Sequence, residues 1–424
     1  MTAATDLSRL RAWSKVPAPR FMGANHIELL QGGDELFPRM CAAMDAAVSE
    51  IWLATYIFHD DPAATTIAQA LKAAAARGVA THVVVDGFGS IGTMARVRKL
   101  FEGSAVRLEV FRPLDRWYAW LQPGQLRRLH QKLCVCDGEL AFVGGVNLID
   151  DRHDINHGWM DAPRLDYSVA ITGPLAAAVH ATARAMWARA HLWRGWREEV
   201  RQLARSARPM GEAMALVRQL RGALHPEDLP DPRPMRAAFL VRDNLRQRRA
   251  IERSYVEAIR HAQRRVDLAV PYFYPGRMFR RALRQAARRG VQVRLLLQGK
   301  VDYRIAALAA HALYDELRHH GVRIFEYTPA FLHAKVAVVD DDWATVGSSN
   351  IDPLSLLLNL EANVVVRDAD FSASLAASLQ RAFDVSREVV GAPERTGWRR
   401  WLHRGVVAWA ANLYLRVAGI TGRY

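Results

Sequence analysis

The chain has 424 residues, half of them apolar, and a formal net charge of +15. This size and apolar content exclude a disordered chain and allow two or three domains with buried cores. The charge indicates a polyanionic partner, either nucleic acid or an anionic membrane surface. Only six of the 58 cationic residues are lysines, so an arginine bias accounts for part of the charge.

The three cysteines, Cys41, Cys134 and Cys136, are too few and too poorly placed for a disulfide framework, which indicates a reducing compartment. Cys134 and Cys136 lie in an apolar run and are expected to fill core rather than bind zinc. The first twenty residues lack the apolar segment of a secretory signal. The longest apolar stretch, 405–415, is shorter than the ~18–20 residues of a spanning helix, so any membrane contact is expected at the surface.

Two similar halves follow an N-terminal tail. In the first half, strands are predicted at 26–30, 51–58, 79–87 and 106–113, with helices at 37–49 and 67–78. The second half has predicted helices at 248–263 and 279–290 and strands at 266–273, 291–299 and 322–329. This βαβ order implies parallel strands joined by helical crossovers. Because ALKAAAARGV in one half matches ALRQAARRGV in the other, the halves are diverged duplicates.

The predicted domain plan has five parts. They are a tail (1–24), a first α/β domain (25–200), a helical and Pro-rich connector (201–236), a second α/β domain (237–388) and a basic C-terminal segment (389–424). The last part combines tryptophans on one helical stripe with arginines, which is typical of an in-plane membrane anchor. A terminal helix docked on a domain is the alternative.

The halves differ in the segment before their shared motif. The second half reaches His333 four residues after Pro329, whereas the first reaches His130 seventeen residues after Pro113. The additional residues contain aromatic side chains followed by Arg127 and Arg128. Aromatic residues beside arginines favour an interfacial lip that faces phosphates. A loop whose aromatic side chains pack on the domain is an equal alternative.

The shared motif lies at 130–150 (HQKLCVCDGELAFVGGVNLID) and at 333–353 (HAKVAVVDDDWATVGSSNIDP). Its equivalent positions are occupied by the same residue types: His130 and His333, Lys132 and Lys335, Asp137 and Asp340, Gly144 and Gly347, Asn147 and Asn350. If each stretch is a regular strand, the histidine and the lysine share one face and the aspartate lies on the other. We therefore expect Asp137 and Asp340 to support the site without touching substrate.

Two imidazoles, two ammonium groups and two amides form a cationic, donor-rich pocket when they are brought together. Such a pocket suits a phosphodiester and requires no metal. One histidine can attack phosphorus, while the other protonates the leaving alkoxide and then deprotonates the acceptor. Each histidine also needs an orienting partner on its second ring nitrogen. Glu361 is the candidate for His333, and Asp166 is the candidate for His130.

The motif HxKxxxxD, followed by GGxN or GSxN and present twice, resembles the phospholipase D superfamily over residues 25–385. The resemblance implies an α/β fold of two repeated sandwich units, each with a mixed, mostly parallel sheet flanked by helices, packed face to face around one shared active site. It also implies metal-independent, cofactor-free transfer through a covalent phosphohistidine. Family precedent assigns attack to His130 and acid–base work to His333.

Several softer stretches are similar to bacterial cardiolipin synthases of the shorter type without N-terminal transmembrane helices. They are IELLQGGDELFP, THVVVDGFGS, LHQKLCVCDGELAFVGGVN and the basic, aromatic C-terminus. The half-sites are not equivalent, because Ser348 stands beside the second asparagine and Gly145 beside the first. Ser348, Gly145, Arg127 and Arg128 are the predicted substrate-binding residues.

The resulting functional hypothesis is a phosphatidyltransferase that makes cardiolipin from phosphatidylglycerol or a related donor. Its expected partners are an anionic phospholipid and a membrane surface, and its expected location is the bacterial cytoplasm, peripheral on the inner membrane. Three alternatives stay open. They are a hydrolytic phospholipase D, a nuclease of the same superfamily, which the charge also fits, and a non-catalytic membrane-binding protein.

Overall fold

The computed structural model describes residues 19–113, 128–203, 235–242, 247, 249–300, 313–352 and 359–390, and for 192–203 the backbone alone. The chain divides into two compact units. Among the described residues, those within 22–150 and 168–239 form the N-terminal unit, and those within 19–21, 151–167 and 240–390 form the C-terminal unit. The segment 151–167, placed in the first domain by the domain plan, thus groups with the second half.

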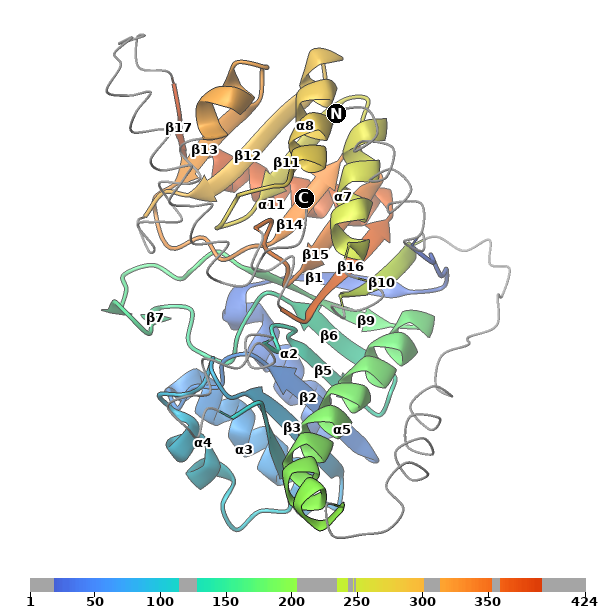
Figure 1. The fold of residues 1–424 in the computed structure, drawn as a ribbon, viewed down its shortest axis with the longest axis vertical. Helices are drawn as coiled ribbons and strands as arrows, with labels where there is room; N and C mark the ends of the chain where they lie inside the picture. Colours follow the sequence, from blue (N-terminus) through green and yellow to red (C-terminus); the bar gives the residue numbers. More distant parts are fainter. Residues whose placement is uncertain are drawn as a thin grey trace. The chain divides into compact units, whose positions relative to one another are not determined.

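A seven-stranded sheet forms the centre of the N-terminal unit (Figure 1). Its strands, in sheet order, are β1 (His26–Gln31), β9 (Tyr167–Thr172), β6 (Leu140–Gly144), β5 (Leu133–Cys136), β2 (Glu50–Thr55), β3 (Ala80–Asp86) and β4 (Arg107–Phe111). β2, β3 and β4 are parallel, whereas the pairs β2–β5, β5–β6 and β6–β9 are antiparallel. The sheet is therefore mixed, with crossover helices only in its parallel part.

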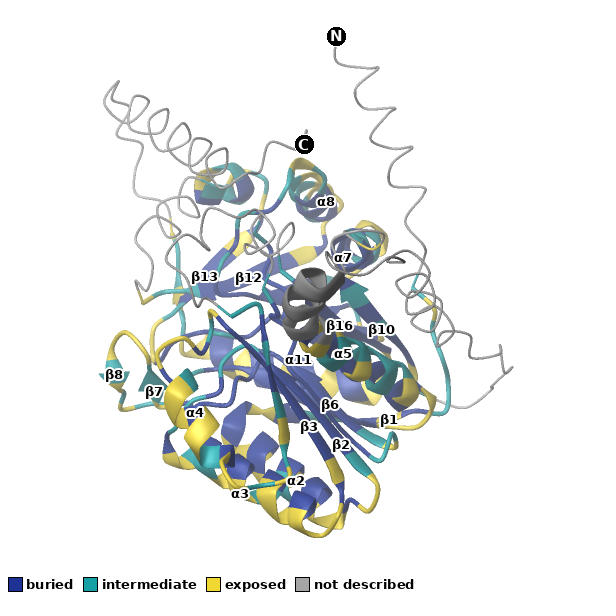
Figure 2. Cartoon of the chain, turned by 60° about the horizontal axis from the view of Figure 1, so that its bottom comes forward, coloured by how far each residue is buried: buried dark blue, intermediate teal, exposed yellow. Residues whose placement is uncertain are grey.

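Helices cover both faces of this sheet. α2 (Gly32–Ala46), α3 (Pro62–Ala76) and α4 (Met94–Phe101) pack on one side, and α5 (Pro174–Leu203) runs along the other. Alternation along the strands explains the two layers, because Ile51 and Leu53 enter the core under α2 and α3 while Trp52 points toward α5. Buried strands between partly exposed helices are visible in Figure 2.

The C-terminal unit repeats the plan with an eight-stranded sheet. Its order is β10 (Arg236–Arg242), β16 (Glu361–Arg367), β15 (Trp343–Gly347), β14 (Val336–Val339), β11 (Arg265–Ala269), β12 (Gln292–Gln298), β13 (Arg323–Tyr327) and β17 (Arg387–Glu388). β12 is parallel to β11 and β13, and β14 and β15 are antiparallel to their neighbours. The helices are α7 (Ala250–His261), α8 (Arg277–Arg288) and α11 (Ala369–Asp384).

These elements confirm the predicted α/β class and the two repeated units. Each predicted strand is present within a few residues of its expected bounds, for example β3 at 80–86 and β12 at 292–298. Cys134 and Cys136 are buried in β5 as core residues, as expected. Among the helices that the structure describes, none combines the length and the apolar character needed to cross a membrane.

A short hairpin lies between β6 and β9 in the chain. β7 (His153–Asp154) pairs antiparallel with β8 (Gly158–Trp159), and both belong to the C-terminal unit. After the hairpin, Arg164 donates to the His153 carbonyl at 2.7 Å. Leu165 then forms a parallel bridge with Leu332. This bridge brings residues 165 and 166 beside the second motif.

Candidate active site

In the N-terminal unit, the motif begins before its strand. His130 and Lys132 precede β5, which starts at Leu133, so the expectation that both residues lie on a regular strand is wrong. The lysine side chain folds back instead, and its Nζ donates to the His130 carbonyl at 2.7 Å. Both side chains are buried. The motif lysine therefore holds the backbone of the histidine.

The C-terminal unit has the same arrangement. Lys335 Nζ donates to the His333 carbonyl, and β14 begins after the lysine, at Val336. The backbone N–H of Gly347 donates to the Lys335 carbonyl at 3.2 Å, as that of Gly144 does to Lys132 at 3.3 Å. The two repeats thus reproduce the same local hydrogen bonds, and the repeated lysine is a positioning group as well as a cation.

The glycines of the motif are required by close packing against the next strand. A Cβ atom on Gly144 would lie 2.1 Å from Ser168 Oγ, and one on Gly347 would lie 2.3 Å from Asn363 Cγ. Neither distance is compatible with a side chain. These glycines let β6 and β15 approach β9 and β16, and the turn that follows places Asn147 and Asn350.

Asp166 orients His333. The Asp166 Oδ2 atom accepts from His333 Nδ1 at 2.5 Å, and Asp166 is fully buried. The Leu165 carbonyl accepts from the backbone N–H groups of His333 and Ala334 at 2.8 and 2.9 Å. The prediction that Asp166 serves His130 is therefore wrong. The reason is that residues 151–167 fold with the second repeat although they follow the first motif.

This bond decides the tautomer of His333. With its Nδ1 proton donated to a carboxylate, a neutral imidazole keeps a lone pair on Nε2. Burial and then the Lys335 ammonium lower the pKa of His333 to about 3, although Asp166 opposes them. Burial also lowers the pKa of Lys335 to about 8. Burial raises the pKa of Asp166, but Lys335 and His333 outweigh it and lower that pKa. The half-site thus holds a neutral imidazole between a cation and a carboxylate.

Glu361 was the predicted partner of His333, but the Nδ1 atom of that histidine is bonded to Asp166. Glu361 Oε2 accepts from Ser348 Oγ at 2.6 Å. The Ser348 hydroxyl also accepts from the Ala362 N–H at 3.0 Å, and the backbone N–H of Ser348 donates to the Ala362 carbonyl at 2.9 Å. Since a hydroxyl has one proton, Ser348 fixes Glu361 here instead of presenting a donor to a phosphate.

Asp137 and Asp340 organise loops. Asp137 Oδ1 accepts from the backbone N–H groups of Ser49 and Glu50 and from Ser49 Oγ, and Oδ2 accepts from Val48. Burial raises the pKa of Asp137, but these hydrogen bonds lower it to about 2. Asp340 accepts in the same way from the N–H groups of residues 263–265. Both aspartates adopt a left-handed backbone, with φ near 53° and 52°.

Tyr56 is a site residue that sequence reasoning missed. Its ring centroid lies 4.9 Å from that of His130, and Lys132 Nζ lies 5.4 Å from its ring centre. Tyr56 follows β2 directly. Two residues later, Phe58 forms a parallel bridge with Leu148. Asn147 Oδ1 accepts from the Ile57 N–H at 3.3 Å. The only sequence signal was an aromatic residue at the end of a strand, next to the polar run HDDP.

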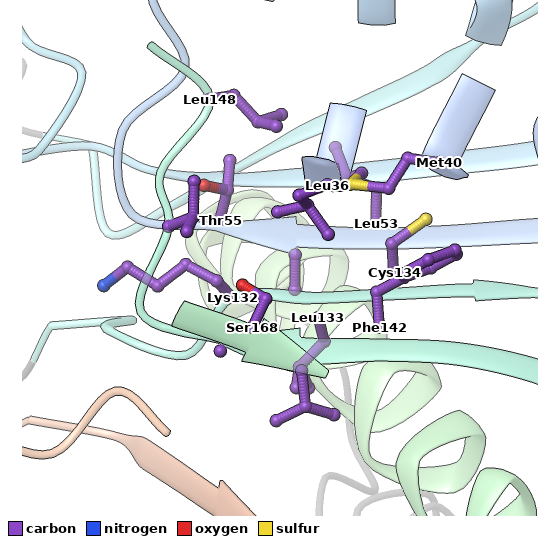
Figure 3. Close-up of a pocket in the computed structure, with 14 residues that line it drawn as sticks. Leu36, Met40, Leu53, Thr55, Lys132, Leu133, Cys134, Phe142, Leu148 and Ser168 are labelled. Carbon is purple, nitrogen blue, oxygen red and sulfur yellow. The ribbon is translucent and has the colours of Figure 1, made fainter. Parts of the chain in front are cut away.

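A small pocket lies beside Lys132 in the N-terminal unit (Figure 3). Its walls are mostly apolar and include Leu36, Met40, Leu53 and Phe142, while the lysine ammonium points away from them. Its free volume of ≈ 20 Å³ has room for about one water molecule. The pocket is therefore too small for an acyl chain.

The remaining predicted site residues are distributed as follows. Gly145 and Asn350 are buried in the turns after β6 and β15. Arg128 donates to the Arg112 carbonyl at 3.2 Å and lies over the Phe88 ring at 5.1 Å. Arg127, the aromatic lip at 114–127 and almost all of the basic segment 389–424 lie outside the described residues.

Comparison with known proteins identifies relatives over most of the chain. A family model described as cardiolipin synthase, PLD-like domain, matches residues 40–160 and 255–383. Cardiolipin synthase B of Escherichia coli K12 and of Shigella flexneri are each 35% identical over 387 residues, which are 88% of this chain and 85% of the relative. Cardiolipin synthase A of Pseudomonas putida KT2440 is 30% identical over 380 residues, covering 90% of this chain and 73% of the relative.

Among solved structures, a phosphatidylserine synthase of Haemophilus influenzae has a similar fold. It aligns with a TM-score of 0.63 over 97% of this chain and 98% of that protein, at 11% sequence identity. At this identity the likeness concerns the fold alone. It extends through both repeats.

Proposed function

Because the chain belongs to the phospholipase D superfamily, in the family described as cardiolipin synthase, PLD-like domain, we propose that it makes cardiolipin by phosphatidyl transfer. It is a phosphodiester transferase of that superfamily. The proposed donor is phosphatidylglycerol or a related phospholipid, and the acceptor is the hydroxyl of a second phosphatidylglycerol. The observation that carries the proposal is a partly buried His333 whose Nδ1 is bonded to Asp166 and whose backbone carbonyl accepts from the Lys335 ammonium, in a motif that occurs twice.

In the first step, His130 attacks phosphorus, so that a P–N bond forms and the bond from phosphorus to the headgroup oxygen breaks. Lys132, Lys335 and the two asparagines hold the non-bridging oxygens and stabilise their developing charge. The leaving alkoxide takes its proton from His333. The mechanism requires both half-sites to act on one phosphorus atom.

In the second step, His333 removes the proton of the acceptor hydroxyl, whose oxygen attacks the phosphohistidine. The P–O bond of cardiolipin forms and the P–N bond breaks. The neutral state of His333 suits this step directly. For the first step His333 must carry a proton. A phosphodiester anion beside Lys335 favours this state, because it offsets the ammonium charge that lowers the pKa of His333.

The test is product analysis by mass spectrometry, using purified protein and vesicles of phosphatidylglycerol without added metal. We expect cardiolipin and glycerol in equal amounts. Phosphatidic acid in place of cardiolipin would show a hydrolase, and cleavage of single- or double-stranded DNA in a parallel reaction would show a nuclease. A protein that binds the vesicles and converts neither substrate would be the non-catalytic alternative.

Trapping the phospho-enzyme tests the roles of the two histidines. With ³²P-labelled donor and rapid acid quenching, we expect the label on the peptide that contains His130. A His333→Ala variant should accumulate this label when the donor has a good leaving group, since that step then needs no acid. Label on His333 in the wild-type protein would reverse the assignment.

The proposed location is the cytoplasmic face of the bacterial inner membrane. It is supported by the net charge of +15, which favours a surface of anionic lipid, and by a substrate that resides in the bilayer. Fractionation of cells into soluble, peripheral and integral proteins tests it. We expect release of the protein from membranes by high salt or carbonate, and retention after both washes would contradict a peripheral association.

A further inference from the structure

Two equivalent strands end in side chains that hold the residue before each motif histidine. In the N-terminal unit, Asp86 is the last residue of β3, and its Oδ2 accepts from the Leu129 N–H at 2.8 Å. In the C-terminal unit, Gln298 is the last residue of β12, and its Oε1 accepts from the Leu332 N–H at 3.1 Å. Leu129 and Leu332 are almost completely buried. Each unit therefore anchors its motif at the same point.

The local backbone is the same after both residues. Gly87 and Gly299 follow, and their N–H groups donate to the carbonyls of Phe111 and Tyr327 at 2.8 and 3.0 Å. A Cβ atom would lie 2.6 Å from the Arg112 carbonyl at the first glycine and 2.7 Å from the Tyr327 carbonyl at the second. The chain thus turns tightly against the next strand in both units, in the same register.

The two anchors differ in chemistry because they serve different numbers of donors. Asp86 is fully buried, and its Oδ1 also accepts from the Phe88 and Gly89 N–H groups at 2.8 and 3.1 Å. Only a carboxylate offers acceptors to three converging N–H groups. Gln298 is partly exposed and bonds the Leu332 N–H, for which one amide oxygen suffices.

We propose that Asp86 and Gln298 are positioning residues for His130 and His333, respectively. The inference rests on the proposed function, in which these histidines react with a phosphodiester. In the C-terminal unit the position of His333 is then set from both sides, by Gln298 on the preceding residue and by Asp166 on the ring. A displacement of about 1 Å at a reacting group can cost on the order of 100-fold in rate, so these anchors act on turnover through the histidines.

The test compares three variants of the full chain. Gln298→Met keeps the size of the side chain and removes the acceptor, whereas Gln298→Glu keeps an acceptor. Gln292→Met makes the same change at the exposed first residue of β12 and is the control. With phosphatidylglycerol vesicles, we expect Gln298→Met to lower kcat at least about 10-fold with KM within about 2-fold. Gln298→Glu should restore most of kcat, and Gln292→Met should match wild type.

Asp86 offers a second test, the pH dependence of kcat, which a purely structural role would not change. Burial raises the pKa of Asp86 to about 6, against its hydrogen bonds and Arg128. Below this pH the Asp86 carboxylate is protonated and no longer accepts fully from its three N–H donors. We therefore expect kcat to decrease as the pH falls below about 6. In Asp86→Asn the kcat should be low at all pH values and this acid limb should be absent. An acid limb equal to that of wild type would contradict the role of Asp86.

Hydrogen–deuterium exchange tests the anchor independently of activity. In Gln298→Met the peptide that contains Leu332 and His333 should exchange faster than in wild type and in Gln298→Glu. If Gln298→Met shows the same exchange as wild type, or the same kcat as an active wild-type protein, the inference is overturned. A wild-type protein that is inactive on phosphatidylglycerol would instead refute the proposed function, and the exchange result would still decide whether Gln298 holds the motif.

Discussion

At the scale of single residues, His333 is subject to opposing influences. Burial and the Lys335 ammonium favour the neutral ring, whereas the Asp166 carboxylate favours the charged ring. The lowered pKa means that the first two prevail in the unliganded site. In the proposed mechanism, the negative charge of a phosphodiester held by Lys335 changes this balance and favours the protonated ring of His333.

The tautomer of His333 gives the first prediction. In Asp166→Asn an amide can donate to Nδ1, which moves the ring proton to Nε2 and removes the lone pair that the acceptor hydroxyl needs. We expect kcat for cardiolipin formation to fall roughly 10²–10⁴-fold with little change in KM. Asp161→Asn, an exposed position in the same segment, is the matched control. Equal activity of the Asp166 variant would refute the orienting role.

A second prediction concerns stability and pH. The pKa of His333 is lowered from 6.5 to about 3 in the folded protein, so the unfolded chain binds more protons between these values. The free energy of unfolding must therefore fall as the pH falls through this window. Urea unfolding between pH 7 and pH 4 should show a smaller loss in His333→Gln than in wild type. Parallel curves for the two proteins would contradict the lowered pKa.

At the scale of elements, the two sheets use different chemistry at equivalent positions. Trp52 of β2 and His82 of β3 are paired in register and stack with ring centroids 3.8 Å apart. In the C-terminal unit the corresponding pair is Asp267 of β11 and Arg294 of β12, joined by bonds of 2.7 and 2.9 Å. A stacked pair under α5 thus corresponds to a buried ion pair, although the backbones match.

The ion pair gives a prediction for stability. Asp267 is fully buried and the Arg294 side chain is 10% exposed. Arg294→Met leaves an uncompensated buried carboxylate and should lower the free energy of unfolding by about 3–5 kcal/mol. Arg323→Met breaks an exposed pair with Glu388 and should cost about 0–1 kcal/mol. Chemical denaturation measures both, and equal losses would contradict the role of burial.

At the scale of the whole molecule, the net charge gives a test of the proposed contact with a membrane. A net charge of +15 favours anionic over zwitterionic lipid, and salt screens this attraction with a Debye length of about 10 Å at 0.1 M. We expect co-sedimentation with phosphatidylglycerol vesicles at low salt and a marked decrease at about 0.5 M salt. Phosphatidylcholine vesicles should bind weakly at both. Binding that is independent of salt concentration and of the lipid headgroup would indicate a mainly apolar contact.

The sequence predicted the fold well because the apolar pattern of each strand is local and because the whole pattern occurs twice. Short runs of apolar residues define strands such as β3 and β12, and the duplication supported each assignment with a second copy. The candidate site residues were chosen from the same duplication, since His, Lys and Asn recur at fixed offsets. The assumption that the histidine and the lysine lie on a regular strand was wrong, because the strands begin only after Lys132 and Lys335.

The partners of the motif residues could not be predicted in the same way. Asp166 lies in the sequence with the first repeat, and only the bridge between Leu165 and Leu332 reveals that it serves His333. Asp86 and Gln298 differ in residue type, so the match of their roles depends on backbone geometry that no motif encodes. Hydrogen bonds between residues far apart in the chain are the part of the site that requires a structure.

The placement of residues 151–167 has a consequence for dissecting the protein. If the chain were cut at the Pro-rich connector, the C-terminal fragment would carry His333 without the carboxylate and the backbone carbonyl that hold it, because these remain on the other fragment. The protein therefore cannot be divided into two autonomous halves at its most obvious linker. A fragment that begins near Asp151 would keep the C-terminal half-site whole, but it would also have to accommodate the rest of the first repeat, from β9 to the end of α5.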